Sequence, residues 1–340
     1  MKKVIFAALT MAALIFAVNS AYAYSGDELL AVCDPNSQKY GYAEKNGKIK
    51  IPYMYNIAND FSCGAALVGR SGKLYYIDAY NRVMFNSDTG EYRFYYNFSE
   101  DLCVASKNGK FGYLNKDGSV AIDFIYDDAY SFCEGLACVS RDGRAGYIDR
   151  EGKTAVDFIY DDGESFKEGL ARVNKNGRYG FIDKSGRRCV PAIYETAAEF
   201  CEGVSCVKLG GMYTYVGKNG YIYFPPVFEE AKSFKNGSAL VKINGKYGRI
   251  RLDGTYKALP KFDSYREFHG KYAVAGKYDE NGNLLFGITD EYANRVTPMI
   301  YEKIIYNDGV YAMYRNGKTV FVDDELNEIV PDDTEMLQIN

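Results

Sequence analysis

Phe111-Gly112-Tyr113-Leu114-Asn115 recurs 34 residues later as Ala145-Gly146-Tyr147-Ile148-Asp149, and again as Tyr179-Gly180-Phe181-Ile182-Asp183. The second slot of this motif falls at residues 41, 75, 112, 146, 180, 214, 248, 287 and 320, and the spacing is 34 residues in most intervals. A fixed period over nearly the whole chain indicates an array of small units rather than one large domain.

One copy, residues 169–202, shows the content of a unit. Leu170-Ala171-Arg172-Val173 alternates as a strand does, and Asn176-Gly177 follows as a type I′ hairpin signal. Residues 178–183 form the expected second strand, and residues 187–191 form the third. Each unit is therefore predicted to be a three-stranded meander followed by a segment that crosses to the next unit. Such a unit cannot bury enough apolar surface alone, so neighbouring units must share a core.

The glycine of the motif lies inside the second strand, where glycine often marks a close approach of another backbone. We therefore predict a structural role, in which any side chain would collide with the segment packed on the strand. The glycines concerned are Gly41, Gly112, Gly146, Gly180, Gly248 and Gly287.

These residues resemble the WG-repeat family of bacterial proteins, also called KWG repeats. Gly135-Leu136-Ala137, Gly146-Tyr147-Ile148-Asp149 and Tyr160-Asp161 match the family pattern, and the resemblance is good over residues 30–260. The chain has no tryptophan, and the slots of the family tryptophan hold an aromatic residue in six of nine copies: Tyr40, Leu74, Phe111, Ala145, Tyr179, Tyr213, Tyr247, Phe286 and Thr319. The resemblance implies an all-β repeat protein, often exported, without established catalytic residues. The expected fold is all-β, with tandem repeats of about 34 residues stacked as an open solenoid-like or a propeller-like array.

The first 23 residues have the features of a secretory signal peptide. Lys2 and Lys3 precede an apolar run over residues 4–18, and Ala21-Tyr22-Ala23 is a small-residue cleavage site. We expect an exported protein that is periplasmic, at the cell surface or secreted, with no transmembrane segment after cleavage. The predicted organisation is a signal peptide at 1–23, a repeat array at 24–264, and divergent C-terminal repeats with a tail at 265–340.

The charge of the chain excludes some partners. The formal net charge is −4, with 41 basic and 45 acidic residues. Nucleic-acid binding needs a basic surface that neutralises phosphates, so no nucleic-acid partner is expected. Binding to anionic lipid by charge is disfavoured for the same reason.

Two copies of one cysteine pattern lie two repeats apart. Cys133 and Cys138 occupy the same positions as Cys201 and Cys206, and the copy between them holds neither cysteine. An even number of cysteines in an exported protein permits disulfides, so each pair is a candidate for a local bridge. The alternative is four small thiols packed in the core. Two separate pairs without further ligands make a metal site less favoured than either.

The remaining polar candidates favour structure over catalysis. The lone histidine, His269, cannot form a multi-histidine metal site, and we expect a loop position for it. The pairs Asp127-Asp128 and Asp161-Asp162 recur at the repeat period, which favours carboxylates that cap turns over a hydrolase dyad. No catalytic, cofactor-binding or metal-binding residue is therefore predicted.

The 33 tyrosines suggest a binding surface, because tyrosine is enriched at protein interfaces. The leading hypothesis is an exported, non-enzymatic repeat scaffold that binds a protein or peptide. A cell-envelope glycan-binding module is the alternative, and a hydrolase is the least favoured.

Overall fold

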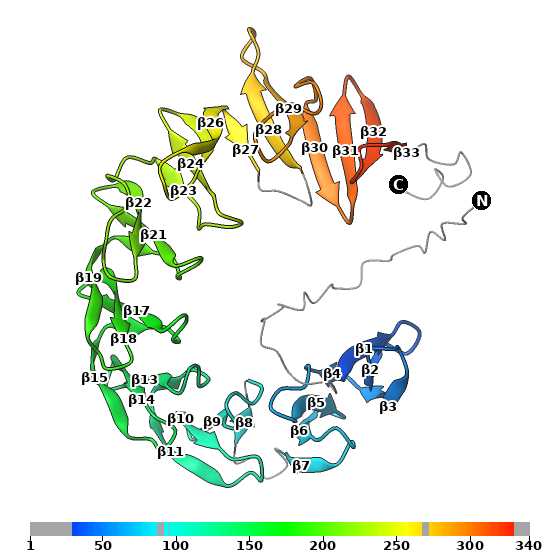
Figure 1. Cartoon of the computed structure of the whole chain (residues 1–340). Coiled ribbons are helices and arrows are strands. Elements are labelled where there is room, and N and C mark those ends of the chain that lie inside the picture. The colour runs from blue at the N-terminus through cyan, green and yellow to red at the C-terminus, as the bar shows by residue number, and fades with distance from the viewer. Residues whose placement is uncertain (1–28, 87–91, 95, 267–271, 330–340) are drawn as a thin grey trace. The chain divides into compact units, whose positions relative to one another are not determined.

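The computed structural model describes residues 29–86, 92–94, 96–266 and 272–329, in which all regular elements are β-strands (Figure 1). The predicted signal peptide at 1–23 and His269 lie outside these residues. The chain divides into two compact units, residues 1–86 and 87–340. The boundary predicted after residue 264 falls inside the second unit.

The first unit contains two antiparallel sheets. One has the order β1-β2-β3 and the other the order β4-β5-β6-β7. Their strands are β1 (Leu30–Asp34), β2 (Lys39–Ala43), β3 (Ile49–Tyr55), β4 (Ile57–Ala58), β5 (Ala66–Arg70), β6 (Lys73–Ile77) and β7 (Val83–Asn86).

The second unit continues with sheets of the same kind, in the order of the sequence. The first sheets are β11-β10-β9-β8, β12-β13-β14-β15, β16-β17-β18-β19 and β20-β21-β22. Their strands are β8 (Arg93–Phe94), β9 (Cys103–Lys107), β10 (Lys110–Leu114), β11 (Val120–Tyr126), β12 (Asp128–Ala129), β13 (Ala137–Arg141), β14 (Arg144–Ile148), β15 (Thr154–Tyr160), β16 (Asp162–Gly163), β17 (Leu170–Lys175), β18 (Arg178–Asp183), β19 (Arg188–Tyr194), β20 (Thr196–Ala197), β21 (Val204–Leu209) and β22 (Met212–Gly217).

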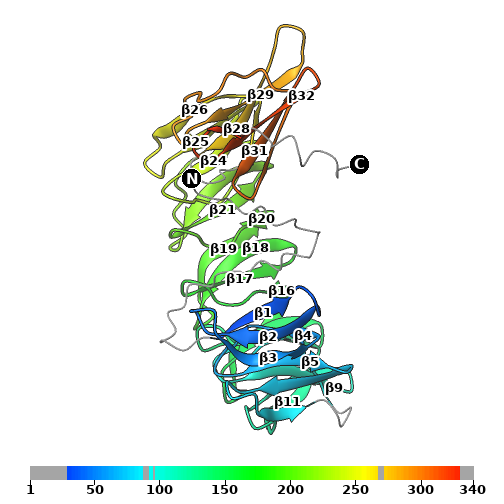
Figure 2. The same ribbon diagram turned by 90° about the vertical axis from the view of Figure 1, so that its right-hand side faces the viewer.

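Three further sheets complete the second unit, with the orders β23-β24-β25-β26, β27-β28-β29 and β30-β31-β32-β33. Their strands are β23 (Glu230–Ala231), β24 (Ala239–Ile243), β25 (Lys246–Ile250), β26 (Tyr256–Phe262), β27 (Ser264–Tyr265), β28 (Ala273–Tyr278), β29 (Leu284–Thr289), β30 (Lys303–Asn307), β31 (Val310–Arg315), β32 (Lys318–Asp323) and β33 (Glu328–Ile329). Figure 2 shows β16 to β19 together as one sheet, with β20 and β21 next to it.

The predicted hairpin turns are confirmed. Asn176 and Gly177 have φ angles of 55° and 74°, as a type I′ turn requires, and they join β17 to β18. The predicted crossing segment also forms a strand, because Asp162–Gly163 pairs with Asn174 and Val173 in the first strand of the next meander. A full sheet such as β16 to β19 therefore has four strands, the first of them short.

The motif glycines of the second strands lie opposite an irregularity in the pairing with the third strand. Between β18 and β19 the register shifts, and a Cβ added to Gly180 would lie 2.7 Å from both the Val190 oxygen and the Ala192 nitrogen. A backbone atom within 3 Å meets the added Cβ at every motif glycine predicted to be structural: Gly41, Gly112, Gly146, Gly180, Gly248 and Gly287. The predicted close approach of two backbones is thus confirmed.

The residue after the second slot of the motif supplies the buried ring in several repeats. Tyr113, Tyr147 and Tyr215 are fully buried. Each hydroxyl donates a hydrogen bond to the carbonyl 17 residues further on, over 2.7 Å to Tyr130, 2.8 Å to Glu164 and 2.6 Å to Lys232. In the first unit, Tyr42 donates in the same way to Asn59. Burial raises the pKa of each of these phenols well above its usual value.

The copy with Phe181 in this slot lacks the tyrosine hydroxyl, and a different side chain supplies the hydrogen-bond donor. Ser205 is fully buried and donates from its hydroxyl to the Ala198 carbonyl over 2.6 Å. The equivalent residue is an alanine in other copies, at Ala137, Ala171 and Ala239, and a cysteine in one, at Cys103. Since a polar group removed from water needs a partner, the serine supplies the donor that phenylalanine lacks.

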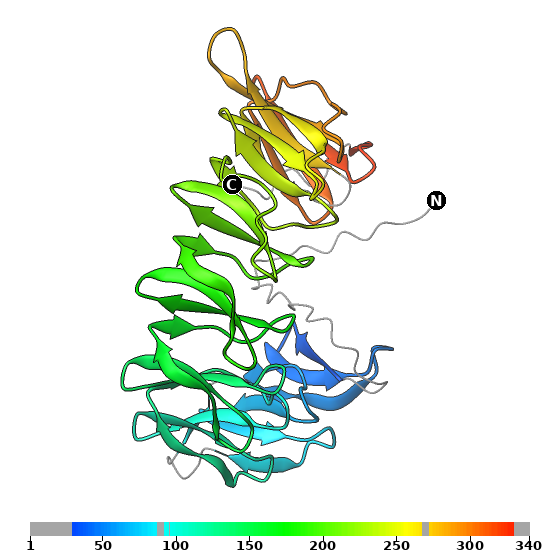
Figure 3. The same ribbon diagram turned by 60° about the vertical axis from the view of Figure 1, so that its left-hand side comes forward.

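Neighbouring repeats share their cores, as predicted. The cluster around Tyr147 and Phe166 also includes Ile182 from the following sheet. The turn at Gly186 lies over the third strand of the preceding sheet, where an added Cβ would lie 3.3 Å from Val156. The same closeness of successive green sheets is visible in Figure 3. A single repeat lacks half of its core, which supports cooperative folding of the array.

Candidate functional site

The repeated aspartates act in turn structure. Asp127 forms an ion pair with Lys110 at 2.5 Å and accepts a hydrogen bond from the Gly143 N–H at 3.4 Å. Asp161 is the equivalent residue one repeat further on. It pairs with Arg144 and accepts a hydrogen bond from the N–H of Asn176. The hydrogen bond from Lys110 is the main cause that holds the pKa of Asp127 below its usual value. These contacts confirm the predicted role in capping turns.

A second carboxylate series joins consecutive repeats, and the sequence reasoning missed it. Glu134 accepts the N–H of Gly169 at 3.0 Å, and Glu202 accepts that of Gly237 at 3.0 Å. Glu100 accepts the N–H of Gly135 at 3.0 Å in the same way. Part of the signal was present as a Glu-Gly pair before β13 and before β21, at Glu134 and Glu202, whereas Glu100 is followed by an aspartate. Each of these glutamates therefore joins the turn before the first strand of one repeat to the equivalent turn of the next repeat.

The four candidate cysteines are free thiols in the structure, like the other four of the chain, so neither local disulfide is formed there. Cys138 and Cys206 are buried in β13 and β21, whereas Cys133 and Cys201 lie in the turns before those strands and are half-buried. Burial raises the pKa of Cys138 and of Cys206 to about 12, which keeps both as neutral thiols. The buried pair behaves as the packing alternative describes.

Aliphatic residues recur at one slot of four successive repeats, three of them on third strands. Ile125 on β11, Ile159 on β15 and Ile193 on β19 are 47%, 46% and 46% exposed, and Val227 holds the next slot at 39%. Each strand ends its sheet and shares the burial pattern of its neighbours, and the three strands follow one another along one side of the array (Figure 1). We call these four residues the aliphatic row.

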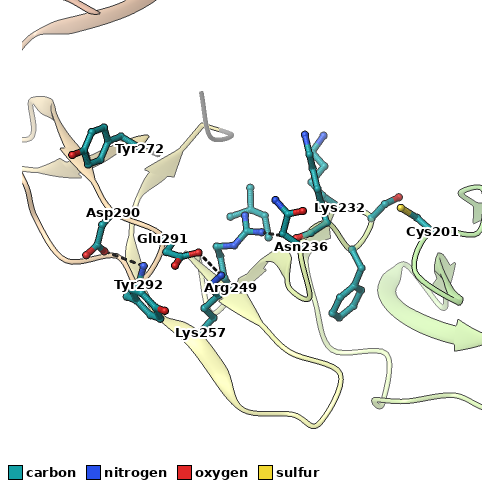
Figure 4. A pocket seen from close by; sticks show the side chains of 13 residues that line it. Cys201, Lys232, Asn236, Arg249, Lys257, Tyr272, Asp290, Glu291 and Tyr292 are labelled. Atoms are coloured by element: carbon teal, nitrogen blue, oxygen red, sulfur yellow. Dashed lines mark hydrogen bonds and ion pairs between the residues drawn. The ribbon is translucent and has the colours of Figure 1, made fainter. Parts of the chain in front are cut away.

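A hollow of about 1000 Å³ lies between the sheet of β23 to β26 and the sheet of β27 to β29, with Arg249 in its middle (Figure 4). The Arg249 guanidinium donates to the Ser238 hydroxyl at 3.0 Å and to the Ser238 carbonyl at 3.2 Å. Lys257 pairs with Glu291 at 2.6 Å on the opposite side, and its Nζ lies 5.6 Å from the centre of the Tyr292 ring.

The described residues lack two kinds of feature. They contain no group of three or more His, Cys, Asp and Glu side chains suited to a metal ion. They also contain no helix of the length and apolar character needed to cross a bilayer.

The sheets, shared cores and recurring turn caps define a tandem β-repeat protein. The model of the WG-containing repeat family matches residues 40–73, 111–144, 146–179, 179–213 and 213–247, which together make half of the chain. The chain belongs to the WG-containing repeat family. No curated protein matches it in sequence.

Solved structures resemble the chain only distantly. A eukaryotic initiation factor is 13% identical, with 90% of this chain and 84% of that chain covered and a TM-score of 0.38. Hsv2 of Kluyveromyces lactis is 8% identical, with 78% and 92% covered and a TM-score of 0.34. The WD40 domain of Pan2 from Neurospora crassa is 11% identical, with 57% and 74% covered and a TM-score of 0.27. Likenesses at these TM-scores carry no argument about function.

Proposed function

We propose that this protein is an exported, non-enzymatic binding scaffold that holds a protein or peptide partner on its third strands. The aliphatic row of Ile125, Ile159, Ile193 and Val227 carries this proposal. Single exposed apolar residues are common on soluble proteins. A β-branched residue exposed at the same slot of four successive copies is a repeated surface feature and not a singly scattered residue.

The third strands favour recognition through side chains over addition of a further strand. Their edges carry the features that prevent strand pairing: the bulge opposite each motif glycine, exposed Asp123 and Asp157, and Pro191 at the equivalent slot. Aliphatic side chains also lack the flat ring on which a sugar stacks. The row therefore suits apolar side chains of a polypeptide better than a glycan.

The polar groups support a scaffold over a hydrolase. Asp127 and Asp161, the carboxylates that a glycosidase dyad would need, accept backbone N–H groups and cations of the repeat itself. Export rests on Lys2, Lys3 and the apolar run over residues 4–18, followed by Ala21-Tyr22-Ala23.

The test is selection of displayed random peptides on the immobilised protein, with Ile159→Ser and Ile193→Ser combined as the variant. We expect peptides rich in apolar residues that bind the unchanged protein and lose most of their affinity for the variant. The control is Glu151→Ser, an exposed change in the turn before β15. Peptides that bind all three proteins equally, or no enrichment at all, would contradict the proposal.

A further inference from the structure

The hollow around Arg249 is where two regular features of the repeat change together. The slot that holds the buried ring in other copies, such as Tyr215 one repeat earlier, holds Arg249 here. The slot that holds the turn-capping carboxylate, Glu202 one repeat earlier, holds Asn236 here. One change adds a positive charge and the other removes a negative charge. Both residues line the same hollow.

The lining of the hollow is more basic than the protein. It includes the cations Lys232, Lys235, Arg249 and Lys257, and the anions Asp290 and Glu291, which gives a formal excess of two positive charges. The whole chain carries −4. Lys257 and Glu291 neutralise each other at 2.6 Å, so the excess lies on the other cations.

The positions of the cations make the excess available to a ligand. Lys232 and Lys235 are both exposed, and Figure 4 shows Lys232 beside Asn236, with Arg249 between Asn236 and the Lys257–Glu291 pair. The guanidinium of Arg249 is held in place by its hydrogen bonds to Ser238. A fixed, largely buried cation with two exposed cations beside it suits a carboxylate.

Aromatic rings complete the hollow. Tyr272 and Tyr292 both line it, and Tyr292 is 53% exposed. An exposed ring offers a flat face to the C–H groups of a sugar, while Asn236 offers an amide that can donate and accept hydrogen bonds. The volume of about 1000 Å³ lies at the upper end of the range for small-ligand sites, so it can hold more than one sugar unit.

We propose that the hollow binds an acidic oligosaccharide, with a sugar ring on Tyr292 and a carboxylate at Lys232, Lys235 and Arg249. Polyphosphates suit it less well, because Asp290 and Glu291 repel a dense negative charge. The same two carboxylates can accept hydrogen bonds from sugar hydroxyls. This site is separate from the aliphatic row, so either proposal can fail without the other.

The test is isothermal titration calorimetry on the full-length mature protein. The probes are trigalacturonic acid, a mannuronic acid trimer and a disaccharide of N-acetylglucosamine and N-acetylmuramic acid. The variant combines Lys232→Gln with Lys235→Gln, two exposed changes that leave the core intact. The control is Lys167→Gln, since Lys167 occupies the slot of Lys235 two repeats earlier and pairs there with Glu199.

We expect saturable binding of at least one acidic probe, weaker by about tenfold or more in the double variant because hydrogen bonds to charged groups are lost. Lys167→Gln leaves binding unchanged, raised salt weakens it, and the uncharged methyl ester of the bound sugar does not bind. The proposal is overturned if none of the probes binds, or if the double variant binds as tightly as the control. Tighter binding of ATP, or full competition by acetate, would overturn the assignment to an acidic sugar.

Discussion

Ser205→Ala removes the donor that replaces a missing tyrosine hydroxyl. The Ser205 hydroxyl donates to the Ala198 carbonyl over 2.6 Å and is fully buried. A carbonyl left without its donor in a buried site costs about 1–3 kcal/mol. For a unit of about 250 residues, such as residues 87–340, each kcal/mol corresponds to a fall in Tm of roughly 2–4 °C. We therefore expect Ser205→Ala to lower the Tm by several degrees.

Phe181→Tyr should restore the stability that Ser205→Ala removes. Phe181 occupies the slot of Tyr147, and its ring lies 4.7 Å from Phe200, as Tyr147 lies 5.0 Å from Phe166. The added hydroxyl would thus reach the Ala198 carbonyl as the other tyrosines reach theirs.

The assay is thermal unfolding of the single and double variants, followed by circular dichroism. Ala171→Ser is the control, because Tyr147 already donates to the Glu164 carbonyl that lies at the equivalent site. This change should give no gain. The reasoning is refuted if Ser205→Ala leaves the Tm unchanged, or if the double variant is no more stable than Ser205→Ala alone.

Three other predictions concern the backbone, the pH dependence and the thiols. Gly180→Val should cost about 3 kcal/mol or more, because its side chain meets the backbone of β19, whereas Gly177→Ala should cost about 1–2 kcal/mol for its positive φ alone; equal Tm values would contradict this. Stability should fall as the pH rises above 9, because Cys138 and Cys206 keep their protons to about pH 12 in the folded protein but lose them from about pH 9 in the unfolded chain. The measurement is the Tm between pH 9 and 10 for the unchanged protein and for a variant with alanine at both positions. The same pH slope of Tm in both proteins would count against this prediction. Titration of the denatured, unreduced protein with a thiol reagent should find eight free thiols. A count of four would instead support the hypothesis of two local disulfides.

The period of the sequence was sufficient to predict the three strands of the meander, the hairpin turns and the role of the motif glycines, but not the short strand in the crossing segment. Asn176-Gly177 and Gly180 each impose a local backbone geometry that few other residues allow, so their recurrence translates directly into structure. The role of Asp161 followed for a similar reason, because its carboxylate caps a turn that lies only 15 residues further along the chain.

The rest depends on contacts between repeats, which the period does not specify. The tryptophan slot of the family drew attention to residues such as Tyr179. The fully buried ring of a repeat instead lies two residues after that slot, as Tyr147 lies two residues after Ala145. The glutamate series was visible in part, as Glu-Gly pairs at Glu134 and Glu202, yet each partner glycine lies 35 residues away. The hollow at Arg249 arises only when two sheets are placed side by side.

The central claim is that the aliphatic row holds a protein or peptide partner, and site-specific photocrosslinking in the producing cell tests it most directly. A photoreactive amino acid is placed at Ile159 or Ile193, and at Glu151 as an exposed control. Both row positions are predicted to crosslink to the same polypeptide, which then binds the purified protein and not the combined Ile159→Ser Ile193→Ser variant. Equal crosslinking from Glu151, or no crosslinked polypeptide at either row position, would contradict the claim.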